Sequence, residues 1–178
     1  LACDEKIRLQ SGDVVVFGQL TFRYRQLSSN LFPSDGNLPK TIGAYRVIGK
    51  LGSGGMGVVY DAVDSQGKEV AIKVPLPNLV QDREFVRRFN REMRLGSTLK
   101  HPRLTEIYYF EPAGEGRYPY LVMEKLSGSD LTAQALPVSI FQALDWTEQL
   151  LEALEVLHAA GVVHRDLKPA NLYLTPSG

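Results

Sequence analysis

The sequence has a single cysteine, no long apolar run and no excess of basic residues, and each of these features excludes a class of protein. Its single cysteine, Cys3, cannot form an internal disulfide and fits a reducing, cytoplasmic compartment. No apolar run approaches the roughly 18 residues that a membrane-spanning helix needs, so no membrane segment is expected in this chain. Lys and Arg number 20 and Asp and Glu also number 20, so the basic excess typical of nucleic-acid-binding proteins is absent and no nucleic-acid partner is expected.

The sequence also lacks an initiator Met and the pattern of a signal peptide, and its last residues read as a strand entering a turn. We therefore expect a piece of a longer protein. With 44% hydrophobic and 22% charged residues, the 178-residue chain has the balance of a soluble globular protein of one domain or slightly more.

The first part of the chain alternates short strand and turn patterns. Residues 1–27 predict a β-meander of three short strands, at 6–9, 14–17 and 20–25. Residues 28–44 are rich in Ser, Asn, Pro and Gly, which predicts a linker and a domain boundary.

From residue 45 the pattern becomes that of an α+β domain. Turn residues separate the β-prone runs, and apolar residues recur at helical spacing twice, as in Phe85, Phe89 and Met93. Gly161 stands where a glycine ends a helix. The expected strands are 45–51, 58–63, 69–74, 105–111 and 119–126, the expected helices are 81–95 and 139–160, and a strand–loop–strand region follows from Val162.

A glycine cluster joins the first two of these strands. Gly52, Gly54 and Gly57 match the pattern G-x-G-x-x-G, in which a backbone without Cβ atoms can approach a phosphate closely. A tight hairpin turn is an equal alternative for the glycines alone. In dinucleotide-binding folds such glycines lead into a helix, whereas here they lead into another strand, which favours a flap over a nucleotide.

Three further positions carry charge where phosphate chemistry could use it. Lys73 ends the apolar strand that follows the glycine hairpin, where it is either a solvated edge residue or a phosphate ligand. Glu92 lies beside Met93 on the first helix and is either solvated or turned toward Lys73. The run His164-Arg165-Asp166-Leu167-Lys168-Pro169-Ala170-Asn171 combines a proton acceptor, a cation and a metal-ligating amide, which together suit phosphoryl transfer better than an ordinary charged loop.

The ordered set of glycine hairpin, Val70-Ala71-Ile72-Lys73 and H-R-D-L-K-P-x-N resembles the eukaryotic-type Ser/Thr protein kinases over residues 45–178. The step Lys168-Pro169 is similar to the Ser/Thr rather than the Tyr kinases, and LGSGGMGVVY is similar to bacterial members. The resemblance implies a β-rich small lobe with its hinge over residues 45–126 and an incomplete, helical large lobe over 127–178. It also implies ATP and Mg²⁺ as cofactors and a protein substrate phosphorylated on Ser or Thr.

The resemblance also assigns roles by position. It makes Asp166 the catalytic base, Lys168 the γ-phosphate contact, Lys73 the α- and β-phosphate ligand, Glu92 the partner of Lys73 and Asn171 the Mg²⁺ ligand. Arg165 before the base implies control by phosphorylation of an activation loop. The remaining nucleotide-binding positions are the glycines, the adenine pocket with its gatekeeper Met123, and the ribose position Asp130: Leu51, Gly52, Gly54, Gly57, Val59, Ala71, Met123, Glu124, Leu126, Asp130 and Tyr173.

The sequence contains no Asp-Phe-Gly, the motif whose Asp holds a metal ion in this family. We therefore expect residues 1–178 alone to be inactive and the parent protein to be an active kinase, because Lys73, Glu92, Asp166, Lys168 and Asn171 are all present. A pseudokinase, or a truncated scaffold that works by contact, is the alternative.

Residues 7–24, IRLQSGDVVVFGQLTFRY, resemble the closing strands of a forkhead-associated (FHA) domain. An unrelated β-meander is the alternative. The resemblance implies that an upstream FHA module of the parent protein would bind a phosphothreonine partner.

Overall fold

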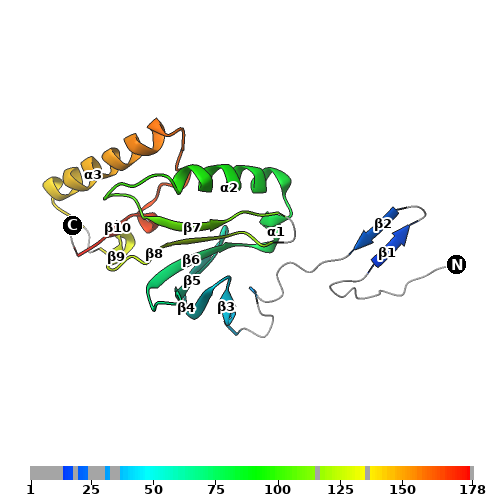
Figure 1. The fold of residues 1–178 in the computed structure, drawn as a ribbon. Helices are drawn as coiled ribbons and strands as arrows, with labels where there is room; N and C mark the ends of the chain where they lie inside the picture. Colours follow the sequence, from blue (N-terminus) through cyan, green and yellow to red (C-terminus); the bar gives the residue numbers. More distant parts are fainter. Residues whose placement is uncertain are drawn as a thin grey trace.

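The computed structural model describes residues 31–32, 37–114, 117–134 and 137–176, together with the backbone of 14–17 and 20–23. Its strands and helices follow one another in the order shown in Figure 1. The elements are β1 (Val14–Phe17), β2 (Leu20–Arg23), β3 (Thr41–Ile42), β4 (Tyr45–Gly54), β5 (Gly57–Val63), β6 (Glu69–Pro75), α1 (Pro77–Val80), α2 (Arg83–Gly96), β7 (Ile107–Glu111), β8 (Tyr120–Glu124), β9 (Ser129–Asp130), η1 (Leu131–Ala133), α3 (Ile140–Ala159), η2 (Pro169–Asn171) and β10 (Tyr173–Leu174).

A six-stranded antiparallel sheet in the order β3-β4-β5-β6-β8-β7 is the centre of the molecule. We call this sheet, with α1 and α2, the small lobe. The pair β9–β10, α3 and the two 3₁₀ turns form the described part of the large lobe. All five strands predicted between residues 45 and 126 are present, and the fold is the kinase-like α+β fold that the resemblance implies.

Capping interactions mark the start of one long helix and the end of the other. Asp82 accepts hydrogen bonds from the N–H groups of Glu84 and Phe85 at 2.8 and 3.3 Å, which caps the start of α2. At the end of α3, Gly161 has a φ of +72°, and the Val162 N–H reaches back to the Leu157 carbonyl at 2.9 Å. The glycine cap predicted for the helix 139–160 is therefore confirmed.

The apolar stripe of α2 faces the sheet, along which the helix lies in Figure 1. Phe89 contacts Phe110 of β7 edge to face, with the ring centroids 5.7 Å apart. The other face of the sheet carries the buried core, which includes Val70, Ile72 and Val74. Because side chains alternate along a strand, Ala71 and Lys73 lie on the face opposite this core.

The predicted linker of residues 28–44 differs from the structure at two points. Ile42 is fully buried and pairs with β4, so the sheet begins inside the predicted linker. Leu31 and Phe32 also pack against the core, where the Phe32 ring meets Tyr118 edge to face at 5.8 Å. Apolar residues in a polar stretch thus become part of the small lobe, because the sheet's outer face would otherwise be exposed.

The attachment of Leu31 to the small lobe should contribute measurably to the free energy of unfolding. The Tyr60 hydroxyl donates a hydrogen bond to the Leu31 carbonyl at 2.9 Å. We expect Tyr60→Phe to lower the free energy of unfolding by about 1 kcal/mol, the usual net value of one such bond. The same substitution in a chain that begins at residue 37 should cost much less, since the acceptor is gone. An equal cost in both backgrounds, measured by urea denaturation, would show that Leu31 does not anchor the segment.

The other predictions near the ends have mixed outcomes. Two of the three strands predicted in residues 1–27 are present, as β1 and β2, which pair antiparallel with each other. The first, at 6–9, lies outside the described residues, and the resemblance to an FHA domain stays a prediction. The strand expected at Val162 is wrong, because Val162 instead completes the cap of α3. The second strand of that region exists as β10 and pairs with β9, which was not expected.

Candidate active site

The glycine hairpin is the first part of the site. Strands β4 and β5 pair up to Gly54 and Gly57, so Gly55 and Met56 form the turn. A Cβ on Gly57 would lie 2.3 Å from the carbonyl oxygen of Val74, so this position excludes any side chain. At Gly52, Gly54 and Gly55 a Cβ would meet nothing within 4 Å. The hairpin therefore borders open space, where its backbone can receive a ligand.

Strand register places Lys73 in line with this hairpin. Gly52 pairs with Val59, Val59 with Lys73, and Lys73 with Leu121, which makes one row across four strands. Burial lowers the pKa of the Lys73 amine, while the charge of Asp166 raises it and that of Lys168 lowers it again. Lys73 therefore lies within electrostatic reach of the residues that follow α3.

These residues form a compact hydrogen-bonded group. Asp166 Oδ2 accepts from Lys168 Nζ at 2.9 Å and from Asn171 Nδ2 at 3.0 Å. Asn171 Nδ2 also donates to the backbone carbonyl of Asp166 at 2.6 Å. The bonds from Lys168 and Asn171 hold the pKa of the Asp166 carboxyl below its ordinary range. Asp166 is thus an ionised acceptor, partly open to solvent, that faces a cation and an amide.

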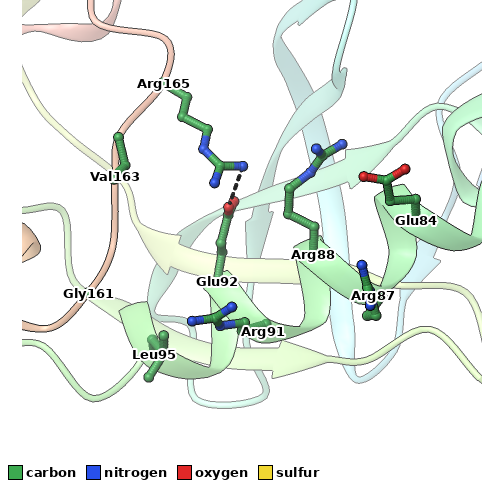
Figure 2. Close-up of a pocket in the computed structure, with 9 residues that line it drawn as sticks. All are labelled: Glu84, Arg87, Arg88, Arg91, Glu92, Leu95, Gly161, Val163 and Arg165. Atoms are coloured by element: carbon green, nitrogen blue, oxygen red, sulfur yellow. Dashed lines mark ion pairs between the residues drawn. The ribbon is translucent and has the colours of Figure 1, made fainter.

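Glu92 does not make the ion pair that the sequence predicts. Its Oε1 lies 3.0 Å from Arg165 Nη1, and the ion pairs of the described residues include none between Glu92 and Lys73. Figure 2 shows the two side chains pointing toward each other across the gap between α2 and the segment after α3. The expected pairing fails in this structure because α2 presents Glu92 to Arg165, a second cation that is less buried than Lys73.

Arg165 also has an uncommon backbone conformation. Its φ of +61° is the only left-handed value at a non-glycine residue in the described part of the chain. Such a conformation costs about 1–2 kcal/mol in an L-residue and persists only where the surroundings enforce it. Here the turn is closed by a hydrogen bond from the Asp166 N–H to the His164 carbonyl at 2.9 Å. The strained residue therefore orients Asp166.

A cavity of about 410 Å³ lies between α2 and this segment. Four arginines and two glutamates border it, and Figure 2 shows Arg87, Arg88 and Arg91 on α2 and Arg165 on the facing segment. Guanidinium groups converging on one cavity can bind a phosphoryl group. The arrangement suits the expected control by phosphorylation, which stays a prediction. The lining residues are Glu84, Arg87, Arg88, Arg91, Glu92, Leu95, Gly161, Val163 and Arg165.

The residues expected to contact adenine lie in two places. Some are in the row of the sheet next to that of Lys73, and others are at and after the end of β8. Ala71 pairs with Met123 and lies two residues from Lys73, so these side chains share a face with it. Leu51 is half exposed on β4. A separate cavity of about 700 Å³ is bordered by Glu124, Leu126, Asn171 and Tyr173 together with α3. Neither Lys73 nor the glycine hairpin lines this cavity, so it is not the whole of the expected nucleotide site.

Asp130 has a structural role of its own. Its Oδ1 accepts hydrogen bonds from the N–H and the hydroxyl of Thr132, which cap η1 and lower the pKa of the Asp130 carboxyl. Tyr173 pairs with Asp130 across β9 and β10. The structure thus brings the expected ribose and adenine-floor residues next to each other, and their roles toward a nucleotide stay predictions.

The donor groups fit a nucleotide and a magnesium ion. Because Asn171 uses its amide nitrogen for Asp166, its oxygen remains as a ligand of the kind that Mg²⁺ prefers. The described residues contain no cluster of three His, Cys, Asp or Glu side chains that could hold a metal ion by itself. Asn171 would therefore be one of several ligands of a magnesium ion at this place.

One feature of the site has no local signal in the sequence. Lys125, directly after β8, binds carboxylates on β5 and β6 that lie 64 and 56 residues away along the chain. The arginines of α2 could have been found, since they recur at helical spacing opposite the apolar stripe.

Comparison with known proteins agrees with this geometry. The family model of the protein kinase domain matches residues 45–178. The serine/threonine-protein kinase PknA of Mycobacterium tuberculosis is 41% identical over 143 residues, which are 76% of this chain and 33% of PknA. The probable serine/threonine-protein kinase SCO3848 of Streptomyces coelicolor is 39% identical over 153 residues, or 79% of this chain and 22% of that protein. The crystal structure of the M. tuberculosis PknI kinase domain matches with a TM-score of 0.66 and 31% identity, over 76% of this chain and 55% of that one.

The chain belongs to the protein kinase family, and its relatives named here are bacterial serine/threonine kinases. It spans a third or less of the length of these two curated relatives. Within the described residues, none of the helices combines the length and apolar character needed to cross a membrane.

Proposed function

We propose that this chain forms the ATP-binding part of a protein kinase that transfers the γ-phosphoryl group of ATP to Ser or Thr hydroxyls. The observation that carries the proposal is the convergence of Lys73, Asp166 and Lys168. They come from β6 and from the segment after α3, Asp166 and Lys168 are 2.9 Å apart, and the charges of both affect the pKa of the Lys73 amine. Positioned charges beside a glycine hairpin are what phosphoryl transfer requires of a protein, since the bond changes occur on the substrates.

Each side chain has a definite task in this proposal. Asp166, held ionised by two hydrogen bonds, accepts a hydrogen bond from the substrate hydroxyl and orients it. Lys168 and Lys73 neutralise negative charge on the phosphates. Asn171 holds a magnesium ion through its side-chain oxygen, and that ion would supply electrostatic stabilisation of the transferred group.

The ion pair between Glu92 and Arg165 adds a conformational condition. In the arrangement described here Lys73 has no carboxylate partner on α2. Glu92 instead forms an ion pair with Arg165, with Oε1 and Nη1 3.0 Å apart. Phosphoryl transfer with the family's Lys–Glu pair in place needs α2 to carry Glu92 toward Lys73. The structure therefore represents a form that has to rearrange before transfer.

The test is nucleotide binding followed by transfer, in the protein expressed from its complete coding sequence. Saturating ATP with Mg²⁺, at about a hundred times the dissociation constant, is expected to stabilise the fold by about 2.7 kcal/mol. Incubation with γ-labelled ATP and a mixed protein substrate should then give labelled phosphoserine or phosphothreonine. ATP binding without transfer would favour the pseudokinase or scaffold alternative, and absence of ATP binding would remove the proposal.

A further inference from the structure

The side chain of Lys125, which directly follows β8, forms ion pairs with residues of β5 and β6. Its Nζ lies 2.9 Å from Asp61 Oδ2 on β5 and 3.2 Å from Glu69 Oε2 on β6. It follows Glu124, which ends β8 and pairs with Val70 of β6. We call these three residues, Lys125, Asp61 and Glu69, the hinge clamp.

The inner half of the hinge clamp is shielded from solvent. The Lys125 and Asp61 side chains are 25% and 17% exposed, whereas the exposed fraction of Glu69 is 61%. The other carboxylate oxygen, Asp61 Oδ1, is buried and has no hydrogen-bond partner among the described residues. The negative charge of Asp61 is therefore compensated mainly by the ammonium group of Lys125. Removal of either residue would leave a poorly compensated, half-buried charge on the other.

The hinge clamp lies on the face of the sheet that carries the phosphate-binding lysine. Asp61 pairs with Ala71, and Ala71 with Met123, which makes a row beside that of Val59, Lys73 and Leu121. Directly opposed residues in antiparallel strands point to the same face. The clamp thus fixes the segment that begins at Glu124 against the edge of the expected adenine pocket.

The chain becomes attached to the large lobe only three residues later. Gly128, with a φ of +110°, passes so close to Leu174 that a Cβ would lie 2.0 Å from its carbonyl oxygen. Ser129 then pairs with Leu174 in the β9–β10 ladder. Leu126 and Ser127 lie between the two attachments and outside any strand or helix.

We propose that Lys125 is a positioning residue for the nucleotide. Through Asp61 and Glu69 it holds Glu124 and Lys125 to the small lobe, so that movement between the lobes is confined to Leu126 and Ser127. The inference rests on the proposed function, because residues 124–126 are the expected adenine edge. It predicts that loss of the clamp weakens binding of ATP without slowing the chemical step.

The experiment compares steady-state kinetics of variants of the protein expressed from its complete coding sequence. For Lys125→Met we expect the KM and the dissociation constant for ATP to rise about tenfold, with kcat within about twofold of the unaltered protein. Lys125→Arg should retain near-normal affinity, because its fork of N–H donors can serve both carboxylates. Lys100→Met is the matched control, since Lys100 makes an exposed ion pair of the same 2.9 Å length with Glu106.

A double-mutant cycle separates positioning from general damage to the fold. In an Asp61→Asn background, Lys125→Met should raise the dissociation constant for ATP much less than it does alone, because the buried charge is already gone. A Lys125→Met variant that melts as a folded protein and binds ATP as tightly as the unaltered protein would overturn the inference. Failure of the proposed function would show differently, as absence of ATP binding by the unaltered protein.

Discussion

Replacement of Asp166 by Asn is expected to lower kcat by about a thousandfold while the dissociation constant for ATP stays within about threefold. The carboxylate of Asp166 accepts hydrogen bonds from Lys168 and Asn171 through one oxygen, Oδ2. A carboxamide can keep such an acceptor and so preserve the local geometry. It cannot accept the proton of a substrate hydroxyl, and the loss therefore falls on the chemical step.

The measurement is the rate of label transfer from ATP together with nucleotide affinity, each compared with an Asp145→Asn control. Asp145 lies on the exposed side of α3 and accepts a hydrogen bond from Gln149 at 2.9 Å, so it has a comparable local bond without a place in the site. Because Lys168 and Asn171 lower the pKa of the Asp166 carboxyl, its protonation should not slow the unaltered enzyme until the pH falls below the ordinary aspartate range. A transfer rate within a few-fold of normal for Asp166→Asn would exclude Asp166 as the base.

Local sequence patterns were sufficient to predict most strands and helices of the small lobe. Runs of β-prone residues and the turn residues between them predicted β4, β5 and β6, and their antiparallel pairing follows from the short turns that connect them. Helical spacing of apolar residues, with Gly161 as a cap for the second helix, predicted the limits of both long helices to within two residues. The motif residues Lys73 and Asp166 could be joined in one site because their order along the chain resembles a known family, which supplies the long-range contact that periodicity cannot.

The remaining features depend on contacts that local patterns do not encode. Helical spacing left Glu92 either solvated or turned toward Lys73, and its partner depends on how the helix lies between two cations, Lys73 and Arg165. The two-residue strands β9 and β10 are too short to show any periodicity. The packing of Phe32 depends on Tyr118, which lies 86 positions further along the chain. In each case the deciding partner is remote in sequence and only the folded chain reveals it.

Replacement of Lys73 by Met is expected to lower kcat/KM for ATP by about two to three orders of magnitude and, at neutral pH, to raise the melting temperature. The two effects have one cause. Burial lowers the pKa of the Lys73 amine, so the folded protein holds a charged group in a place that disfavours charge. The same placement, beside the glycine hairpin and away from solvent, strengthens its attraction for phosphate oxygens.

The sign of the stability effect follows from linkage. A lysine whose pKa is lower in the folded than in the unfolded chain makes the folded state costlier at every pH below both values, and this cost fades as the pH rises through the folded pKa. Met has a similar volume and no charge, so Lys73→Met should gain stability at neutral pH and lose that advantage as the pH approaches the ordinary lysine range.

The check is thermal unfolding of both proteins at neutral and alkaline pH without nucleotide, with the exposed Lys50→Met as control. The difference in melting temperature should be positive and should shrink with rising pH, whereas Lys50→Met should stay near zero throughout. A Lys73→Met variant that is less stable at neutral pH would mean that the attraction of Asp166 outweighs burial. The lysine would then belong to the ion pairs that hold the lobes together in the absence of ATP.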